Sequence, residues 1–529
     1  MTSLCLHRAG RGWILPALCS LLLWLGAAQA VHAHAQLLET SPADGAVLEA
    51  APDRISLRFG EAARAIIARL TLPDGATVVL PDPEDRIDGD TSTISWPLPE
   101  LTARGSYLLS WRVTSADGHP LAGAYLFSIG APSDLQAEVD PVPFATRAGL
   151  WAARSLLIGA LIFGVGGVGF SRVSERRPPR WLRGIAATGL IALPLVLGFQ
   201  GLELLALGPG SLFSTAPWRE GLSGPPGLAL GVAGLALLLA LFAGPFGRGR
   251  ALAILSLIAL GLSFALSGHA ATAAPQVLMR PAVLLHVLAA AFWIGALLPL
   301  AAILATRGDT RTLLRFSALV PGVLALLIAT GLMLAVVQLD HLPALWQTGY
   351  GRILLAKLGL LALLLALALW NRLRLTPRAL AGNPRPLIRA IGAEVVLGAL
   401  IIATLALWRF TPPPRSLPPP ATPIVQILQG DHLSARITLT NDRPGPVRVT
   451  LDDLRLDGVA FTPMETTVEF AKPAYGLGPF ARTIPGQTDD RLDAGSFVLP
   501  IDGFWVVTLT VLVDDFRSEK LRDIITIRK

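Results

Sequence analysis

Charged residues are scarce in this chain, at 15% of its 529 residues, whereas hydrophobic residues make up 52%. Soluble globular domains usually carry about 25% charged residues, and disordered chains contain few hydrophobic ones. The composition therefore excludes a soluble enzyme with a polar surface and also a disordered chain. Something apolar must cover much of the molecular surface, and a lipid bilayer is the obvious candidate.

Cysteine is almost absent, since Cys5 and Cys19 are the two in the chain and both precede residue 30. A disulfide framework and a thiolate metal site are therefore excluded for the rest of the sequence. The P-loop pattern GxxxxGK[ST] is also missing, so the chain carries no sign of its own ATPase.

The first residues are typical of a secretory signal: a basic start, a short apolar core at 13–25 and the small-residue stretch AAQAVHA. We expect residues 1–33 to be a signal peptide that is removed from the mature chain. Cleavage after Ala33 would make His34 the mature N-terminus, and cleavage after Ala30 also fits the pattern.

Two regions are typical of antiparallel β-sandwiches. In residues 34–130, turns such as SPADGA and DRIDGD separate short runs such as ISLRF (55–59), in which apolar and polar residues alternate. Residues 424–529 contain similar runs, including FWVVTLTVLV (504–513). The Pro-rich stretch 411–423 before them is predicted to be a stiff, extended linker.

Residues 145–410 are predicted to form an α-helical membrane bundle of about eight spans. The expected spans lie near 148–170, 182–207, 224–245, 250–268, 281–304, 316–338, 351–371 and 388–409. The odd-numbered connections between them hold most of the arginines, whereas the even-numbered ones hold only Arg219, Arg280 and Arg352. This asymmetry places the odd connections in the cytoplasm and both β domains outside. The net charge of +7 is then an orientation signal, and we expect no nucleic-acid partner.

The histidines concentrate on the outer side of this topology. Beyond the signal region they are His34, His119, His269, His286, His341 and His432. Imidazole is the commonest metal ligand, so the bias predicts a metal-handling outer face. Asp117 and His119 bracket a glycine, and with the amine and imidazole of His34 they would form a tetragonal N/O set suited to Cu(II). The plainer interpretation is that Asp117 caps a turn and His119 packs beside Pro120.

The first β region resembles the periplasmic copper-binding CopC family, through HAQLLETSPADGA at its start, ISLRFGE, YLLSWRVTSADGHPLAG and the closing YLFSIG. The resemblance implies a cupredoxin-like sandwich that binds Cu(II). It implies His34, Asp117 and His119 as ligands, with Glu61 at a further acidic position near the copper. Gln36 stands where some members have a second histidine, and the Met-rich Cu(I) loop of other members is missing.

The membrane region is similar to the CopD family of copper-resistance and copper-uptake membrane proteins. The likeness is clearest in SGHAATAA (267–274), RPAVLLHVLAAAFWIGALLPL (280–300) and YGRILLAKLGLLALLLALALWNRLRL (350–375). The order of the domains resembles YcnJ-type CopC–CopD fusions, and the last domain resembles YtkA/FixH-like modules weakly. We expect a protein of the bacterial inner membrane with its N- and C-terminal domains in the periplasm.

His269 and His286 are the candidate ligands of a second metal site, in a polar vestibule at the outer end of the bundle. Gln200, Glu203 and Lys357 lie near the same end by the expected spans. Ionisable residues inside spans are candidates for function, although each could also be interfacial or reach toward the headgroups.

The predicted function is copper import: the first domain captures Cu(II) and the bundle takes it across the membrane, without enzymatic activity. Without an ATPase, a gradient or coupled reduction must drive the step. One alternative is a membrane haem or redox protein, similar to a cupric reductase, because two histidines near one membrane face could bind haem iron. Another is a copper sensor or chaperone that does not transport. The expected partners are copper ions and the bilayer, while the oligomeric state stays open.

Overall fold

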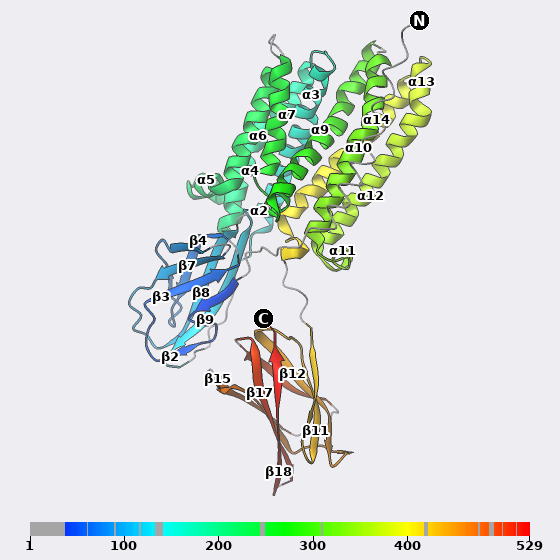
Figure 1. Cartoon of the computed structure of the whole chain (residues 1–529). Coiled ribbons are helices and arrows are strands. Elements are labelled where there is room, and N and C mark those ends of the chain that lie inside the picture. Colours follow the sequence, from blue (N-terminus) through cyan, green and yellow to red (C-terminus); the bar gives the residue numbers. More distant parts are fainter. Residues whose placement is uncertain are drawn as a thin grey trace. The chain divides into compact units, whose positions relative to one another are not determined.

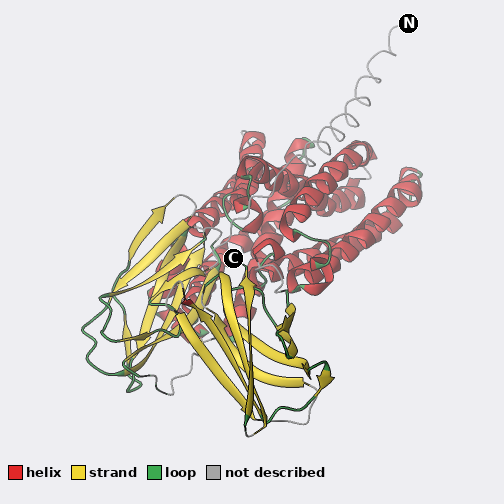
Figure 2. Cartoon of the chain, turned by 60° about the horizontal axis from the view of Figure 1, so that its bottom comes forward, coloured by secondary structure: helices red, strands yellow, loops and turns green. Residues whose placement is uncertain are grey.

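A computed structural model describes residues 37–528 except 61, 89–90, 116–117, 132, 134–140, 244–248, 308–309, 417–421, 474–476, 486–490, 500 and 515. The predicted signal peptide lies outside the described residues. The chain divides into two compact units, one ending at Leu417 and the other beginning at Pro418. The division falls within the Pro-rich stretch. Figure 2 shows that the strands form two β domains and the helices one bundle.

The N-terminal β domain is a sandwich of two sheets, as predicted. Its strands are β1 (Leu37–Ser41), β2 (Val47–Leu48), β3 (Arg54–Phe59), β4 (Ala63–Thr71), β5 (Thr77–Val79), β6 (Glu84–Asp88), β7 (Thr91–Pro97), β8 (Gly105–Ser115) and β9 (Pro120–Ile129). One sheet has the order β1-β3-β7-β6 and the other β2-β9-β8-β4-β5. The alternation in β3 buries Ile55, Leu57 and Phe59 between the sheets.

The bundle consists of long apolar helices with short helices between them. They are α2 (Phe144–Gly159), η1 (Ala160–Val165), α3 (Gly166–Val173), α4 (Arg180–Leu205), η2 (Pro209–Phe213), α5 (Ala216–Leu222), α6 (Gly224–Phe242), α7 (Gly249–Ala265), α8 (His269–Thr272), α9 (Gln276–Arg307), α10 (Thr310–Leu339), α11 (Ala344–Gln347), α12 (Gly349–Trp370), η3 (Asn371–Leu375), α13 (Thr376–Leu380), α14 (Arg385–Ala406), η4 (Leu407–Phe410) and η5 (Pro414–Ser416). In the described part of the chain, seven helices are long and apolar enough to span a membrane, and α7 is a shorter apolar helix. Outward-facing Ile191 and Leu363, 66% and 59% exposed, are the side chains that a bilayer would cover.

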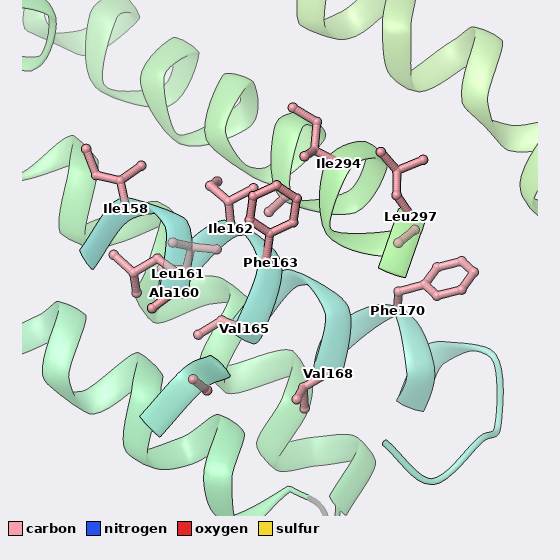
Figure 3. Packing of buried hydrophobic residues seen from close by; sticks show 14 of the residues in the cluster. Ile158, Ala160, Leu161, Ile162, Phe163, Val165, Val168, Phe170, Ile294 and Leu297 are labelled. Atoms are coloured by element: carbon pink, nitrogen blue, oxygen red, sulfur yellow. The ribbon is translucent and has the colours of Figure 1, made fainter. Parts of the chain in front are cut away.

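Small residues let the central helices approach closely. A Cβ placed on Gly295 of α9 would lie 2.6 Å from the carbonyl oxygen of Ile162, and one on Gly166 would lie 2.5 Å from that of Ala291. The chain from α2 through α3 is therefore pressed against α9. Figure 3 shows Ile162, Phe163 and neighbouring apolar side chains packing against α9 at this crossing.

The N-terminal β domain meets the bundle at the end that carries α5 and α11, opposite α3 and α13 (Figure 1). Arg64 of β4 contributes to this contact. Its Nη2 lies 3.0 Å from Oε2 of Glu220 and 2.9 Å from Oγ of Ser223, on α5 and just beyond it. The first β domain and the bundle therefore form one unit.

The C-terminal domain is also β-rich and has a core of its own. Its strands are β10 (Ile424–Gln429), β11 (Leu433–Leu439), β12 (Gly445–Leu456), β13 (Val459–Ala460), β14 (Glu465–Lys472), β15 (Leu477–Pro485), β16 (Arg491–Leu499), β17 (Gly503–Asp514) and β18 (Arg517–Ile527). One sheet has the order β10-β11-β12-β13 with β16 paired to β12, and the other has the order β15-β14-β17-β18. Trp505, Phe470 and Leu451 lie in the shared core, which is the arrangement of a sandwich.

Candidate copper-transfer site

His119 lies on the tight turn between β8 and β9. The Gly118 N–H donates to the Ser115 carbonyl at 2.9 Å, and the Ser115 N–H donates to the His119 carbonyl at 3.0 Å. Gly118 has φ +84°, a backbone conformation that glycine adopts without steric cost. The turn thus fixes the direction in which the His119 side chain leaves the β domain.

A buried ion pair of the bundle also binds the turn that carries His119. Arg409 Nη1 donates to the Gly118 carbonyl at 3.1 Å, and its Nη2 lies 2.6 Å from Oε2 of Glu203. The Arg409 and Glu203 side chains are 4% and 5% exposed. A Cβ on Gly118 would lie 2.2 Å from Cγ of Pro226, so there is no room for another residue type at the contact.

His119 is stacked on His269 of the bundle. The two ring centroids are 3.9 Å apart and the ring planes are inclined by 15°. Imidazole lone pairs lie in the ring plane, so nearly parallel rings direct them along nearly parallel lines. One ring must turn before both nitrogens can bind a single ion. The stack is therefore a contact between two ligand-type side chains rather than a closed metal site.

The backbone at His269 is held from two neighbouring elements. Its carbonyl accepts a hydrogen bond from Nε2 of Gln338 at 3.0 Å and another from Nη2 of Arg415 at 3.0 Å. Arg415 also donates from Nε to Oε1 of Gln338 at 2.9 Å. The segment that carries His269 is thereby fixed to the end of α10.

His286 lies deeper, on α9, and its contacts fix its tautomer. Nδ1 is 3.1 Å from the Leu327 carbonyl and 3.1 Å from Oγ1 of Thr330. A carbonyl can only accept, so Nδ1 carries the proton and the lone pair of the neutral ring is on Nε2. This is the form in which histidine binds a metal, with its other nitrogen bonded to the protein.

A cavity of about 120 Å³ lies beside the stacked pair. Its polar lining comes from His119, Arg154, Gln200, Ser263, Ser267 and Arg409. Gln200 was expected in this vestibule, whereas Glu203 is paired with Arg409 and Lys357 lies 4.8 Å from the centre of the Trp408 ring. Sequence reasoning missed Arg409, because its partner is 206 positions away and no short-range pattern connects them.

The other predicted ligands of the first domain, His34, Glu61 and Asp117, lie outside the described residues. No group of three or more histidine, cysteine or acidic residues that could hold a metal ion occurs among the residues that are described. The copper ligand set around His119 therefore stays a prediction.

The two remaining histidines take surface positions. His341 is partly exposed and lies beside Asp340. His432 Nδ1 is 2.7 Å from Oδ1 of Asp457, and this hydrogen bond raises the pKa of His432 above its usual value. Each of these two histidines therefore has a carboxylate neighbour at the surface of its own unit.

Two protein families match different parts of the chain. The CopC domain matches residues 37–130, and Copper resistance protein D, or CopD, matches residues 310–408. The second match covers α10, α12 and α14 but neither His269 nor His286. The crystal structure of CopC from Methylosinus trichosporium OB3b is 27% identical and covers 20% of this chain and 99% of that chain, with a TM-score of 0.17.

Whole-chain comparison agrees with this division. The copper transport protein CutJ of Bacillus subtilis is 27% identical over 528 residues, covering 92% of this chain and 94% of that protein. Protein YobA of Escherichia coli is 35% identical over 101 residues, covering 19% of this chain and 81% of that protein. Fold and site thus define a multi-pass membrane protein with a copper-binding type of β domain at one end of its bundle. The chain thus combines a CopC domain and a CopD domain in one polypeptide, and its similarity to a copper transport protein extends over most of its length.

Proposed function

We propose that the chain imports copper across the bacterial inner membrane. In this proposal the N-terminal β domain binds Cu(II) through the ligands predicted around His119, and the ion then passes to His269 and His286. The observation that supports it most directly is the stacking of His119 on His269 at 3.9 Å. The distribution of arginine between the connections supports a periplasmic position for this end of the bundle.

The transfer step uses the chemistry of the three rings. Cu(II) prefers imidazole nitrogen and carboxylate oxygen, which are the ligand types predicted in the first domain. A small rotation of the His269 ring would let it replace a ligand of an ion held by His119. The Nε2 lone pair of His286 then offers the next nitrogen, since Nδ1 is bonded to the Leu327 carbonyl.

Copper accumulation in cells tests this function. We expect His119→Ala, His269→Ala and His286→Ala each to lower uptake at least tenfold relative to the wild type. His341→Ala is the matched control, because His341 is a partly exposed histidine that lies beside Asp340 rather than beside another histidine, and it should leave uptake unchanged. Equal accumulation with and without the protein would reject transport. Altered copper tolerance with normal uptake in the three variants would favour a sensor or chaperone.

Two further measurements address the rest of the proposal. N-terminal sequencing of the mature chain should find His34 first, because cleavage after Ala30 would remove the amine from the copper ligands. The absorbance spectrum of the purified protein should lack a Soret band. A Soret band that disappears in His286→Ala would favour the haem or redox alternative.

A further inference from the structure

The candidate spans contain two carboxyl groups, Glu203 and Glu394. Acidic residues are costly inside a bilayer and mark ion or proton pathways when no ion pair accounts for them. Glu203 is accounted for by its 2.6 Å pair with Arg409. Glu394 forms no ion pair with any residue that the structure describes, although its side chain is buried.

Glu394 lines a cavity of about 400 Å³ between α9, α10, α12 and α14, at the end of the bundle opposite His119. It lies nine positions after Arg385, where α14 begins, which is about 14 Å into the helix at 1.5 Å per residue. Most of the lining is apolar, including Trp293, Phe316 and Leu365. The carboxyl group thus lies well inside the span, in a space that is open to a small ligand or to water.

Asn371 accompanies Glu394 in this cavity. It begins the π-helical turn η3, and such turns occur frequently at functional sites. The side chains of Glu394 and Asn371 are close enough to interact, yet neither amide atom of Asn371 has a well-formed hydrogen bond to any described residue. Both residues are buried, at 4% and 6% exposed. The amide therefore faces the carboxyl group without fixing it in one hydrogen-bonded state.

Few other charges face this site. Arg372 of η3 lines the cavity as well, but it is exposed and donates to the Ser317 carbonyl. Of the other elements packed against α14, α2 carries Arg147 and Arg154, and α12 carries Arg352 and Lys357, all toward the opposite end. Arg154 lines the cavity beside His119, Lys357 lies over Trp408, and Arg409 of η4 is paired with Glu203. Arg280 lies near the start of α9 at that same end, and Arg374 of η3 and Arg378 of α13 are exposed and do not line the cavity. Among the described residues, no cation therefore holds Glu394 permanently in its ionised form.

The lining is poorly suited to a metal ion. Calcium takes six to eight oxygen ligands and magnesium an octahedral set, whereas this cavity offers the side-chain oxygens of Glu394, Asn371, Ser317 and Thr376. Cu(I) favours sulfur ligands and copper ions in general also bind imidazole, and no cysteine, methionine or histidine is among the described residues that line the cavity. A proton needs one carboxyl group and access to water, which is what the described lining provides.

We infer that Glu394 is the proton-binding group that couples copper transfer to proton movement through the bundle. The inference rests on the proposed copper transport. In one half of the cycle the carboxylate takes a proton from water supplied from the outer end, and in the other half the carboxylic acid returns that proton to water in this cavity. One proton is carried per cycle, with no change in oxidation state. The proton gradient then supplies the free energy for transport, which ATP hydrolysis supplies in ATP-driven transporters.

Labelling of the purified full-length wild type tests whether Glu394 binds a proton. Dicyclohexylcarbodiimide reacts with protonated carboxyl groups in apolar surroundings, and mass spectrometry of peptides locates the product. We expect labelling of Glu394 that falls at least tenfold as the pH is raised. Glu203 is an internal control that should stay unlabelled, because its carboxylate is paired with Arg409. Absence of label on Glu394 across the pH range would overturn the inference without any variant.

Proteoliposomes that contain a pH-sensitive dye test the coupling. Copper addition should change the internal pH with the wild type, and Glu394→Gln should reduce this change at least tenfold while Glu394→Asp retains part of it. Copper uptake by the wild type without a pH change would overturn the coupling and leave the transport proposal intact. Absence of copper uptake by the wild type would overturn the transport proposal and the coupling with it.

Discussion

The two ends of the bundle hold their acidic residues in opposite ways. At the end that contacts the N-terminal β domain, Glu203 is paired with Arg409, which also donates to the Gly118 carbonyl of that domain. At the opposite end, Glu394 faces a larger cavity beside Asn371, with no ion pair to any residue that the structure describes. The first carboxylate is part of the structure that positions His119, and the second is free to change its protonation state.

This difference separates structural from functional buried charge. A buried ion pair that also forms hydrogen bonds, as Arg409 and Glu203 do, holds its neighbours in one arrangement. A single buried carboxyl group without a cation fixes none, and burial of its charged form is costly. The same residue type therefore indicates a docking contact at one end of the bundle and a proton site at the other.

The largest expected effect separates Glu203 from Glu394 directly. Glu203→Gln leaves Arg409 buried without its carboxylate, so the free energy of unfolding should fall by about 3–5 kcal/mol. Glu394→Gln replaces an unpaired carboxyl group with a neutral group of the same shape and should cost less than about 1 kcal/mol. Thermal unfolding of both full-length variants in detergent measures the difference. Equal losses would remove the distinction between the two ends.

A smaller effect is expected when the contact between the N-terminal β domain and the bundle is disturbed at Gly118. Gly118→Ala forces a non-glycine residue into φ +84°, at about 1–2 kcal/mol, and brings its Cβ against Pro226. Gly75→Ala is the matched control, because Gly75 has φ +85° with no atom within 4 Å of the added Cβ. Both should lower the stability of the β domain similarly.

The two glycine variants should differ in the docking of the β domain. In a chain with His119→Cys and His269→Cys, oxidation should cross-link the two positions, because the native ring centroids are 3.9 Å apart. Added Gly118→Ala should lower the yield of cross-link several-fold, whereas added Gly75→Ala should not. Similar yields of cross-link from both variants would show that the turn at Gly118 does not hold the N-terminal β domain against the bundle.

The architecture was accessible from sequence because it depends on local patterns. Alternation in ISLRF predicts β3, and long apolar runs predict the spans. The expected span 250–268 corresponds to α7, which has 17 residues and is a shorter apolar helix than the seven candidate spans of the described chain. The C-terminal sandwich followed from runs such as FWVVTLTVLV, which forms β17.

The site was only partly accessible, because its contacts join distant segments. Composition and spacing singled out His119 and His269, but their stacking joins two parts of the chain that could not be connected from either neighbourhood. The expected partner of His269 was His286, which bonds to Leu327 and Thr330 on α10. The cavity that gives Glu394 a role joins α9, α10, α12 and α14, so it forms only when these four helices are packed together.

A local change in the packing of His286 tests whether the proposed copper transfer depends on the position of this side chain. A Cβ on Gly331 would lie 3.0 Å from Cε1 of His286, whereas a Cβ on Gly322 of the same helix meets no atom within 4 Å. Gly331→Ala should therefore displace the imidazole by a few tenths of an ångström and reduce copper uptake several-fold. Gly322→Ala should leave uptake unchanged. Equal uptake by both variants would mean that the position of His286 is not critical.

The smallest effect concerns an exposed pair, which contrasts with the buried pair of Glu203. His432 and Asp457 are each 58% exposed in their side chains, and their hydrogen bond raises the pKa of His432 above 6.5. A raised folded-state pKa stabilises the domain below pH 6.5, and this stabilisation is lost as the pH rises through the folded-state value. The melting temperature of the C-terminal domain should therefore exceed that of Asp457→Asn by a small margin below pH 6.5, and the margin should shrink at higher pH. A difference in melting temperature that grows with pH would contradict the sign of this linkage. A difference as large as the one caused by Glu203→Gln would show that the exposed pair stabilises the protein as much as the buried pair does.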